Sequence, residues 1–279
     1  MNVTVGHLYP DYLNIYADRG NIAVLTERAR LRGHELRVVP IGLADAVPDG
    51  IDLFYVGGGQ DREQALVSGD LTRKGEALGE AVEGGAAFLA VCGGYQLLGR
   101  FYRDRAGAEL PGIGLLPLHT VAGERRMIGD VLLECEWAGR TLAGFENHAG
   151  RTHLDEGAEP LGRVLAGFGN DGESGFEGCR QGRVYGTYLH GPLLPRNPWF
   201  ADRVLADALA HATGGEVELE PLADGYEGAP TVDRTTTLRD ALSLMLTEGS
   251  SVCFVRGADG TVTGMLTVRR VSELLSEET

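Results

Sequence analysis

Residues 87–99 read AFLAVCGGYQLLG, and this stretch predicts the centre of the fold. Residues 88–91 form a short apolar run, as expected of a buried strand. Cys92 and two glycines follow at once, and a helical pattern then places Leu97 and Leu98 on one side. A residue held between the end of a strand and the start of a helix lies on a sharp turn, with its side chain above the sheet. This is the geometry of a nucleophile elbow, and it makes Cys92 a candidate nucleophile.

The surroundings of Cys92 favour a reactive thiol. The positive end of the following helix favours the thiolate, which is the nucleophilic form of cysteine. The alternative interpretation is a buried structural cysteine, which packs as a small hydrophobic residue. The strand, the Gly93-Gly94 pair and the helix together favour the nucleophile.

Length and composition limit the class of protein. The 279 residues suffice for one large domain, or for one domain with an appendage. The net charge of −15 argues against nucleic-acid binding, because a basic stripe is needed to neutralise phosphates. We find no apolar run near the roughly 18 residues of a membrane span, and no signal-peptide pattern. The four cysteines are widely spaced without a CxxC pair, so we expect no metal site and a reducing, cytoplasmic location.

Strands and helices alternate in the first part of the chain. Strands are predicted over residues 2–8, 35–39, 51–56 and 88–91, with helices from Asn21 to Gly33, from Asp61, and over 72–83. This order favours right-handed βαβ units and a mainly parallel sheet flanked by helices, which is an α/β fold. After Leu110 the sequence is richer in strands, which are predicted over 113–121, 130–137, 141–146 and 183–189. Pro198 then begins a helix that ends near Gly214.

The last part of the chain differs in composition. Residues 222–230 read LADGYEGAP, which is typical of a linker. We therefore divide the chain into a domain over residues 1–222, a linker over 223–231 and a small α/β segment over 232–279. That segment is predicted to contain a helix over 238–246, strands over 251–255 and 262–267, and a final helix.

A thiol nucleophile needs a base that accepts its proton, and His190 is the best candidate. It ends a predicted strand, and active sites assemble in loops at the carboxyl ends of parallel strands. The alternative is a histidine that only satisfies the polar groups at a strand end. His34 and His211 are predicted to lie on the surface, and His148 and His153 in a polar loop, NHAGRTH, that is able to border a pocket.

The oxyanion that forms in such a reaction needs backbone N–H donors that are in place beforehand. The run Gly57-Gly58-Gly59 follows a predicted strand and offers one donor, and the N–H of Gly93 beside the nucleophile offers the other. A glycine-rich loop after a strand can also hold a phosphate, but this loop matches neither GxxxxGK[ST] nor GxGxxG.

Five motifs of this sequence occur together in one enzyme family. They are YPDYLNIYADRGN at 9–21, GGGQDREQ at 57–64, CGGYQ at 92–96, ENHAGRT at 146–152 and YGTYLHGPLLPRNP at 185–198. In these motifs the chain resembles class I glutamine amidotransferases of the cobyric acid synthase-like branch, and among them the GatD-type glutaminase subunits of lipid II isoglutaminyl synthases. The resemblance covers residues 1–222 and implies the flavodoxin-like, mainly parallel sheet of that class.

The resemblance implies a reaction and the residues that carry it. Cys92 would attack the side-chain amide of glutamine, a γ-glutamyl thioester would form, ammonia would leave, and water would release glutamate. His190 would transfer the protons, and Gly58 and Gly93 would hold the oxyanion. Gln96, which matches the family pattern CxGxQ, would line the substrate pocket.

The resemblance also implies a carboxylate-binding arginine and a partner subunit. An arginine of the middle segment is expected to hold the glutamine carboxylate, because an arginine fork suits that group. Arg126 is the predicted residue, with Arg125 as the alternative. The expected partner is a MurT-type Mur-ligase-like subunit that forms a heterodimer with this chain and amidates D-glutamate of lipid II to D-isoglutamine. ATP and Mg²⁺ are expected only in that partner, and no cofactor is expected in this chain.

Two features depart from the family. Many class I amidotransferases have a glutamate two residues after the catalytic histidine, where this chain has Pro192. Either a Cys–His pair suffices, or the partner subunit supplies a carboxylate on docking. Residues 232–279 resemble a single CBS motif, but the ribose-binding pattern Gly-x-x-Thr-x-x-Asp ends here in Arg270. We therefore favour packing or dimerisation over nucleotide sensing for this segment.

Other functions compete with that of an ammonia-supplying subunit. A cobyrinate-type amidotransferase would use the same chemistry with another acceptor, but the large N-terminal ATPase domain of such enzymes is not in this sequence. A catalytically silent regulatory scaffold would not need Cys92, Gly58 and His190 intact. A cysteine hydrolase that acts on peptides or small aldehydes would need neither Gln96 nor the ENHAGRT motif.

Overall fold

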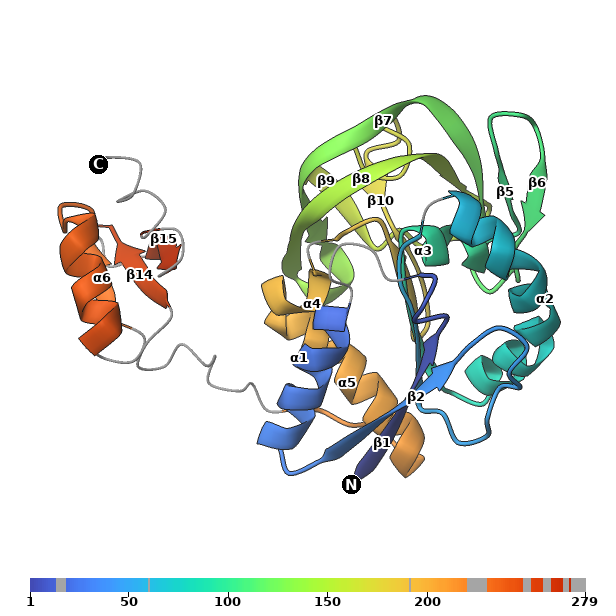
Figure 1. The fold of residues 1–279 in the computed structure, drawn as a ribbon, viewed down its shortest axis with the longest axis horizontal. Helices are drawn as coiled ribbons and strands as arrows, with labels where there is room; N and C mark the ends of the chain where they lie inside the picture. The colour runs from blue at the N-terminus through green and yellow to red at the C-terminus, as the bar shows by residue number, and fades with distance from the viewer. Residues whose placement is uncertain are drawn as a thin grey trace. The chain divides into compact units, whose positions relative to one another are not determined.

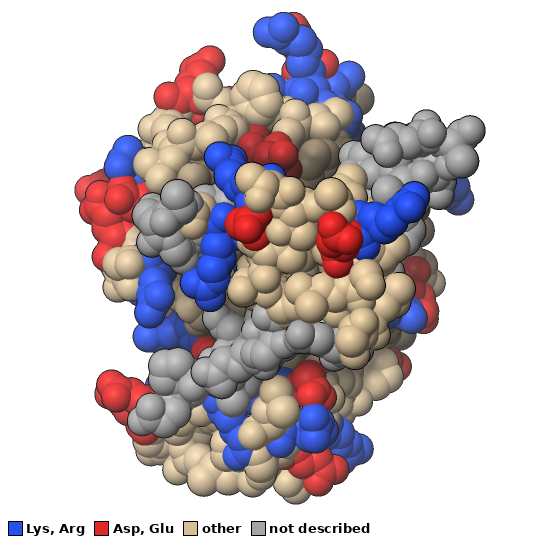
Figure 2. All heavy atoms as spheres, turned by 90° about the vertical axis from the view of Figure 1, so that its left-hand side faces the viewer, with Lys and Arg blue, Asp and Glu red and all other residues tan. Residues whose placement is uncertain are grey.

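The chain is described here by a computed structural model that covers residues 1–13, 19–59, 61–190, 192–219, 230–247, 252–257, 262–267 and 271. Its contacts divide the chain into two compact units, Met1–Leu219 and Glu220–Thr279. Most of the predicted linker, residues 223–229, lies outside the described residues. No helix in the described ranges is long and apolar enough to cross a membrane. Figure 2 shows acidic and basic side chains interspersed with uncharged residues on one face of the molecule.

A six-stranded sheet forms the centre of the first unit (Figure 1). Its order is β11-β12-β4-β3-β1-β2, and every neighbouring pair is parallel except β11 with β12. The strands are β1 (Asn2–Leu8), β2 (Glu35–Ile41), β3 (Leu53–Val56), β4 (Ala87–Val91), β11 (Cys179–Gln181) and β12 (Val184–Thr187). Every residue of β3 and β4 is buried, as expected of parallel strands covered on both faces. The predicted α/β fold with a mainly parallel sheet is confirmed.

Helices cover both faces of this sheet. Helices α1 (Arg19–Leu31), α4 (Leu193–Arg196) and α5 (Pro198–Thr213) lie together on one face, and α2 (Asp61–Glu83) lies on the other (Figure 1). The short α3 (Gly93–Leu98) follows β4 directly. Helix α2 is continuous, whereas the sequence predicts two separate helical regions. Burial of Val67, Leu71 and Leu78 along one side stabilises it in spite of its glycines.

A second sheet follows α3 and has the order β10-β9-β7-β5-β6, with β8 paired to β7. Its strands are β5 (Phe101–Arg103), β6 (Glu109–Pro111), β7 (Leu118–Cys135), β8 (Arg140–Leu154), β9 (Gly162–Ala166) and β10 (Phe176–Glu177). The strands β7 and β8 form one long antiparallel hairpin through a short turn, η1 (Glu136–Ala138). The register shifts between Ala122 and Met127, so residues 123–126 bulge out of β7 opposite Ala149.

The hairpin corrects two predictions. The three strands predicted within residues 113–146 are two longer strands, and the segment NHAGRTH is part of β8 rather than a loop. Alternate residues of β8 are buried from Leu142 to Thr152, including polar ones. Polar residues in this segment suggest a loop, but pairing along β7 satisfies the backbone and the alternation buries one face.

The second unit is small. It contains β13 (Thr231–Asp233), α6 (Leu238–Thr247), β14 (Val252–Arg256) and β15 (Val262–Thr267), and the strands form a sheet of order β13-β14-β15. A cluster of buried side chains holds it together: Val232, Ala241, Met245, Cys253 and Val271. The predicted helix and two strands are present. Of the predicted final helix, the structure describes only Val271. Arg270 also lies outside the described residues.

Candidate active site

Cys92 lies on a strained turn between β4 and α3. Its φ is 51° and its ψ is −108°, a conformation that residues other than glycine rarely adopt. Such strain costs on the order of 1–3 kcal/mol and persists only where the surroundings impose it. Here the N–H of Cys92 donates to the carbonyl of Thr187 at 2.8 Å, and the carbonyl of Cys92 accepts from the N–H of Gln96 at 3.0 Å. The turn is the nucleophile elbow predicted from the sequence, with the thiol at the carboxyl end of β4.

The glycine run after β3 is tied to the first turn of α3. The N–H of Gly94 donates to the carbonyl of Gly57 at 3.1 Å. A Cβ at Gly94 would lie 2.8 Å from the Gly57 oxygen, and a Cβ at Gly93 would lie 3.0 Å from the nitrogen of Gly59. Only glycine allows this approach, and it brings Gly58 and Gly93, the two predicted oxyanion donors, to the same edge of the sheet.

The loop after β1 packs against the same glycine run. A Cβ at Gly59 would lie 2.3 Å from Cδ2 of Leu13 and 3.6 Å from the carbonyl oxygen of Tyr12, so this loop packs closely against Gly59. Tyr9 begins the loop with a φ of 52°, and its hydroxyl donates to Asp70 on α2 at 2.8 Å. The YPDYL part of the first motif therefore supports the glycine run from the outside.

His190 lies beyond the end of β12, the strand that pairs with β4 on the side away from β3. It is 1% exposed. Its N–H donates to the carbonyl of Phe145 on β8 at 2.8 Å, and its own carbonyl accepts from Phe145. The predicted strand over 183–189 is shorter, so His190 follows the strand by three residues. The fold thus brings Cys92 and His190 to neighbouring strand ends at one edge of the sheet.

A buried carboxyl group, which no motif of the sequence predicts, holds the turn that precedes His190. Glu177 on β10 is 0% exposed, and it accepts a hydrogen bond from the N–H of Tyr188 at 2.6 Å. The Thr187 hydroxyl also lies 3.0 and 3.1 Å from its two oxygens. Burial raises the pKa of Glu177 to about 8, against the effect of these hydrogen bonds. The only sequence signal is an acidic residue within the short strand-like segment FEGCR.

We expect Glu177→Gln to change how stability depends on pH. In the folded chain Glu177 keeps its proton up to about pH 8, and in the unfolded chain it loses the proton near its ordinary pKa of 4.5. The folded state binds more protons between these values, so the free energy of unfolding falls as pH rises through this range. Glu177→Gln removes this titration. The variant should therefore lack a fall in the free energy of unfolding on the order of 3 kcal/mol, which we expect in the unaltered chain between pH 5 and pH 8. Urea unfolding at pH 5 and pH 8 measures it, with the exposed Glu173→Gln as the control. An unchanged pH dependence in Glu177→Gln would contradict the assignment.

A cavity of about 750 Å³ opens beside Cys92. It is lined by residues of α2, α3, the second sheet and the connecting segments: Gly59, Arg62, Gln64, Cys92, Gln96, Tyr102, Arg105, Ala122, Arg126, Ile128, Asn147, His148, Ala149 and Gly150. The predicted residues Cys92, Gln96 and Arg126 are thus brought together, and Arg125 is not in the cavity wall. Within the described ranges, no group of three or more His, Cys, Asp or Glu is placed to hold a metal ion.

Arg126 is held at the cavity wall by β8. Its Nε donates to the side-chain oxygen of Asn147 at 2.9 Å, and its Nη2 donates to the Asn147 carbonyl at 2.9 Å. Two of the five N–H donors of the guanidinium are used in this way. Arg126 lies in the bulge at residues 123–126, which cannot be read from the sequence, and its side chain reaches Asn147 on β8 from there.

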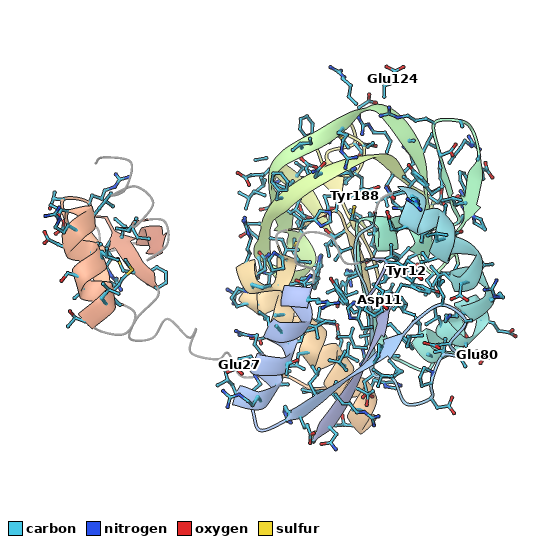
Figure 3. The ribbon with its side chains drawn as sticks, viewed as in Figure 1. Asp11, Tyr12, Glu27, Glu80, Glu124 and Tyr188 are labelled. Carbon is cyan, nitrogen blue, oxygen red and sulfur yellow. The ribbon has the colours of Figure 1, made fainter. Side chains whose placement is uncertain are left out.

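Gln96 lines the cavity, and its amide is also part of a buried hydrogen-bond chain. Its oxygen accepts from Nε2 of Gln64 at 2.8 Å, and its Nε2 donates to the hydroxyl of Tyr188 at 2.9 Å. That hydroxyl lies 2.6 Å from Oγ1 of Thr152, which lies 2.7 Å from Oγ1 of Thr120. Figure 3 shows Tyr188 in the interior of the first unit, below β8.

The other histidines separate into different environments. His148 lies in the cavity wall and stacks on Tyr188, with 3.5 Å between ring centroids and 3° between ring planes. Burial lowers the pKa of His148, although Glu146, 3.5 Å from its Nε2, opposes that shift. The prediction that it borders a pocket is therefore correct, although it lies on a strand. His211 is not simply solvated as predicted, because its Nδ1 lies 2.8 Å from a carboxylate oxygen of Asp52.

The comparison with known protein families agrees with this arrangement. The model of the CobB/CobQ-like glutamine amidotransferase domain matches residues 4–198, which is most of the first unit. The chain belongs to this family. The matched residues form the amidotransferase domain of this chain. They include Cys92, Gly58 and His190.

Individual relatives share this domain. The GatD subunit of lipid II isoglutaminyl synthase (glutamine-hydrolyzing) from Staphylococcus aureus is 43% identical, over 74% of this chain and 84% of that protein. The GatD subunit from Streptococcus pneumoniae is 37% identical, over 80% of this chain and 86% of that protein. Cobyric acid synthase from Hyphomonas neptunium is 32% identical, but the match covers only 42% of that protein. The crystal structure of a glutamine amidotransferase has a similar fold, with a TM-score of 0.51 at 21% identity over 73% of this chain and 98% of that chain.

Proposed function

We propose that this chain is the glutamine-hydrolysing subunit of a lipid II isoglutaminyl synthase. The observation that carries the proposal is the 43% identity to a GatD subunit over 84% of that protein's length. The match to a cobyric acid synthase covers 42% of its length, so the alternative of a cobyrinate-type enzyme has weaker support. The partner would be a MurT-type Mur-ligase-like subunit that uses the ammonia to amidate D-glutamate of lipid II. Four free cysteines suit a cytoplasmic location for this step.

The proposed reaction begins at Cys92. His190 takes the thiol proton, and the sulfur attacks the carboxamide carbon of glutamine. The negative charge that develops on the amide oxygen is stabilised by the backbone N–H groups of Gly58 and Gly93. His190 then gives its proton to the amide nitrogen, ammonia leaves, and a γ-glutamyl thioester remains. Water attacks the thioester with His190 as base, glutamate leaves, and the thiol is restored.

The cavity residues would hold the rest of the substrate. Arg126 is proposed to bind the α-carboxylate of glutamine, since it is held in place by Asn147 with donors remaining for a ligand. Gln96 is proposed to line the pocket beside Cys92. Pro192 stands where many relatives have a glutamate, so we propose either that the Cys92–His190 pair suffices or that the partner subunit supplies a carboxylate on docking.

The test is glutamate release from L-glutamine by the purified chain, alone and in complex with its Mur-ligase-like partner. We expect release in the complex that exceeds release by the lone chain, together with amidation of lipid II that depends on glutamine. Equal kcat for the lone chain and the complex would contradict a carboxylate supplied by the partner. No glutamate release under either condition would overturn the glutaminase proposal and favour a regulatory scaffold.

A further inference from the structure

Gln64, the last residue of the motif GGGQDREQ, is a buried polar residue in the cavity. It lies near the start of α2, is 2% exposed and lines the cavity beside Cys92. Its Nε2 donates to Gln96, but its Oε1 has no hydrogen-bond partner among the described residues. A buried acceptor without a donor is unfavourable, so such an atom in a cavity wall is expected to meet water or a donor on a ligand that displaces the water.

The amide of Gln64 lies against the first turn of α3. A Cβ at Gly93 would lie 2.4 Å from Nε2 of Gln64 and 3.2 Å from its Cδ, so the Gln64 amide packs directly against Gly93. Gly93 follows Cys92 directly, so this amide group lies next to the reacting centre. A substrate whose reacting carbon is at Cys92 therefore comes within reach of Gln64.

In this structure the hydrogen-bond chain occupies the N–H end of the Gln64 amide. Nε2 of Gln96 donates to the hydroxyl of Tyr188, so Oε1 of Gln96 faces Gln64 and accepts from its Nε2. The N–H end of the Gln64 amide is thereby used, and its carbonyl end remains for a ligand. The ligand group must then be a donor.

The topology indicates which donor of glutamine this is. Strand β4, which ends just before Cys92, lies between β12 and β3 in the sheet. His190 comes after β12, on one side of Cys92, and Gln64 lies in α2, which comes after β3, on the other side. The carboxamide nitrogen leaves as ammonia and must face the base, so it points away from Gln64. The remaining donor of glutamine is its α-ammonium group. A charged donor also gives a stronger hydrogen bond than a neutral one.

We propose that Oε1 of Gln64 accepts a hydrogen bond from the α-ammonium group of the substrate and thereby makes the site specific for an α-amino acid amide. This inference rests on the proposed function. Gln64 is a specificity-determining residue in this assignment, because it contacts the substrate away from the reacting atoms. Losing one hydrogen bond to a charged group corresponds to about 10- to 100-fold in affinity.

The experiment removes the proposed hydrogen bond in two ways, by changing the protein and by changing the ligand. Gln64→Met keeps the length of the side chain and removes the acceptor, and glutaramate is glutamine without its α-amino group. Binding of L-glutamine and of glutaramate is measured in the complex with the Cys92→Ala background, so that no ligand is consumed. The exposed Gln181→Met is the matched control. We expect Gln64→Met to weaken L-glutamine binding about 10- to 100-fold and glutaramate binding less than about threefold.

The outcomes separate this inference from the proposed function. Equal losses for both ligands would mean that Gln64 only supports the structure of the pocket, and this would overturn the inference. Unchanged binding of both ligands in Gln64→Met would overturn it as well. Both results leave the proposed function intact, provided that the otherwise unaltered complex releases glutamate from L-glutamine. Failure of that complex to hydrolyse glutamine would overturn the proposed function itself.

Discussion

Replacing Cys92 with alanine is expected to lower kcat for glutamine hydrolysis by at least about 10⁴-fold, because no other group can form the thioester. Cys92 stands at the start of α3 and is the cysteine in the cavity wall. Burial raises the pKa of Cys135 and of Cys179 to about 12, so both thiols stay protonated and unreactive at neutral pH. Cys179→Ala is therefore a matched control that should retain activity.

Alkylation gives a second readout of the same prediction. A short pulse of iodoacetamide should modify Cys92 before Cys135 or Cys179, and glutamine should protect it. Mass spectrometry of the digested chain locates the modified residue. Faster modification of Cys135 or Cys179, or activity of Cys92→Ala within about tenfold of the unaltered chain, would be incompatible with a thioester at Cys92.

The free-energy cost of the strained turn at Cys92 can be measured by substitution. Glycine adopts a φ of 51° without the steric penalty that alanine retains there. Cys92→Gly should therefore be more stable than Cys92→Ala by about 1 kcal/mol, although both variants are inactive. Urea unfolding measures the difference. Greater stability of the alanine variant would mean that the surroundings do not strain this turn.

Replacing His190 with alanine is the second large effect, and we expect kcat to fall by about 10³- to 10⁴-fold. The reason is that His190 would deprotonate the thiol, protonate the leaving ammonia and activate water, so its loss affects every step. Glutamate release under saturating glutamine measures the loss in the complex. His190 is 1% exposed, so thermal unfolding of the variant must also be recorded.

A matched control distinguishes catalysis from general disturbance. His153→Ala replaces a histidine of β8 whose side chain is 48% exposed and which lies outside the cavity wall, so kcat should change by less than about twofold. Retention of more than a tenth of the activity in His190→Ala would exclude His190 as the principal base. Addition of free imidazole tests the role further, since partial rescue of His190→Ala is expected of a missing base and not of a misfolded chain.

Much of the fold follows from local patterns in the sequence. The predicted strands over 2–8 and 262–267 have the bounds of β1 and β15, because alternation and flanking turn residues are local properties. The elbow is also a local feature. An apolar strand, Cys92, two glycines and a helix in succession predict a sharp turn at Cys92. These patterns suffice to place Cys92 and the glycine run after β3 at the carboxyl edge of the sheet.

Only the tertiary structure decides how distant segments complete the pocket. The polar segment around His148 is a strand with one buried face because β7 pairs with it, and the partner of His148 is Met127, 21 positions away. The roles of Glu177 and Gln64 depend in the same way on Tyr188 and Gln96, which the folded chain brings beside them. A sequence pattern reports the conformation of neighbours along the chain. The direction of a buried amide and the proton on a buried carboxyl group are set by contacts across the fold, and these form only when the chain has closed.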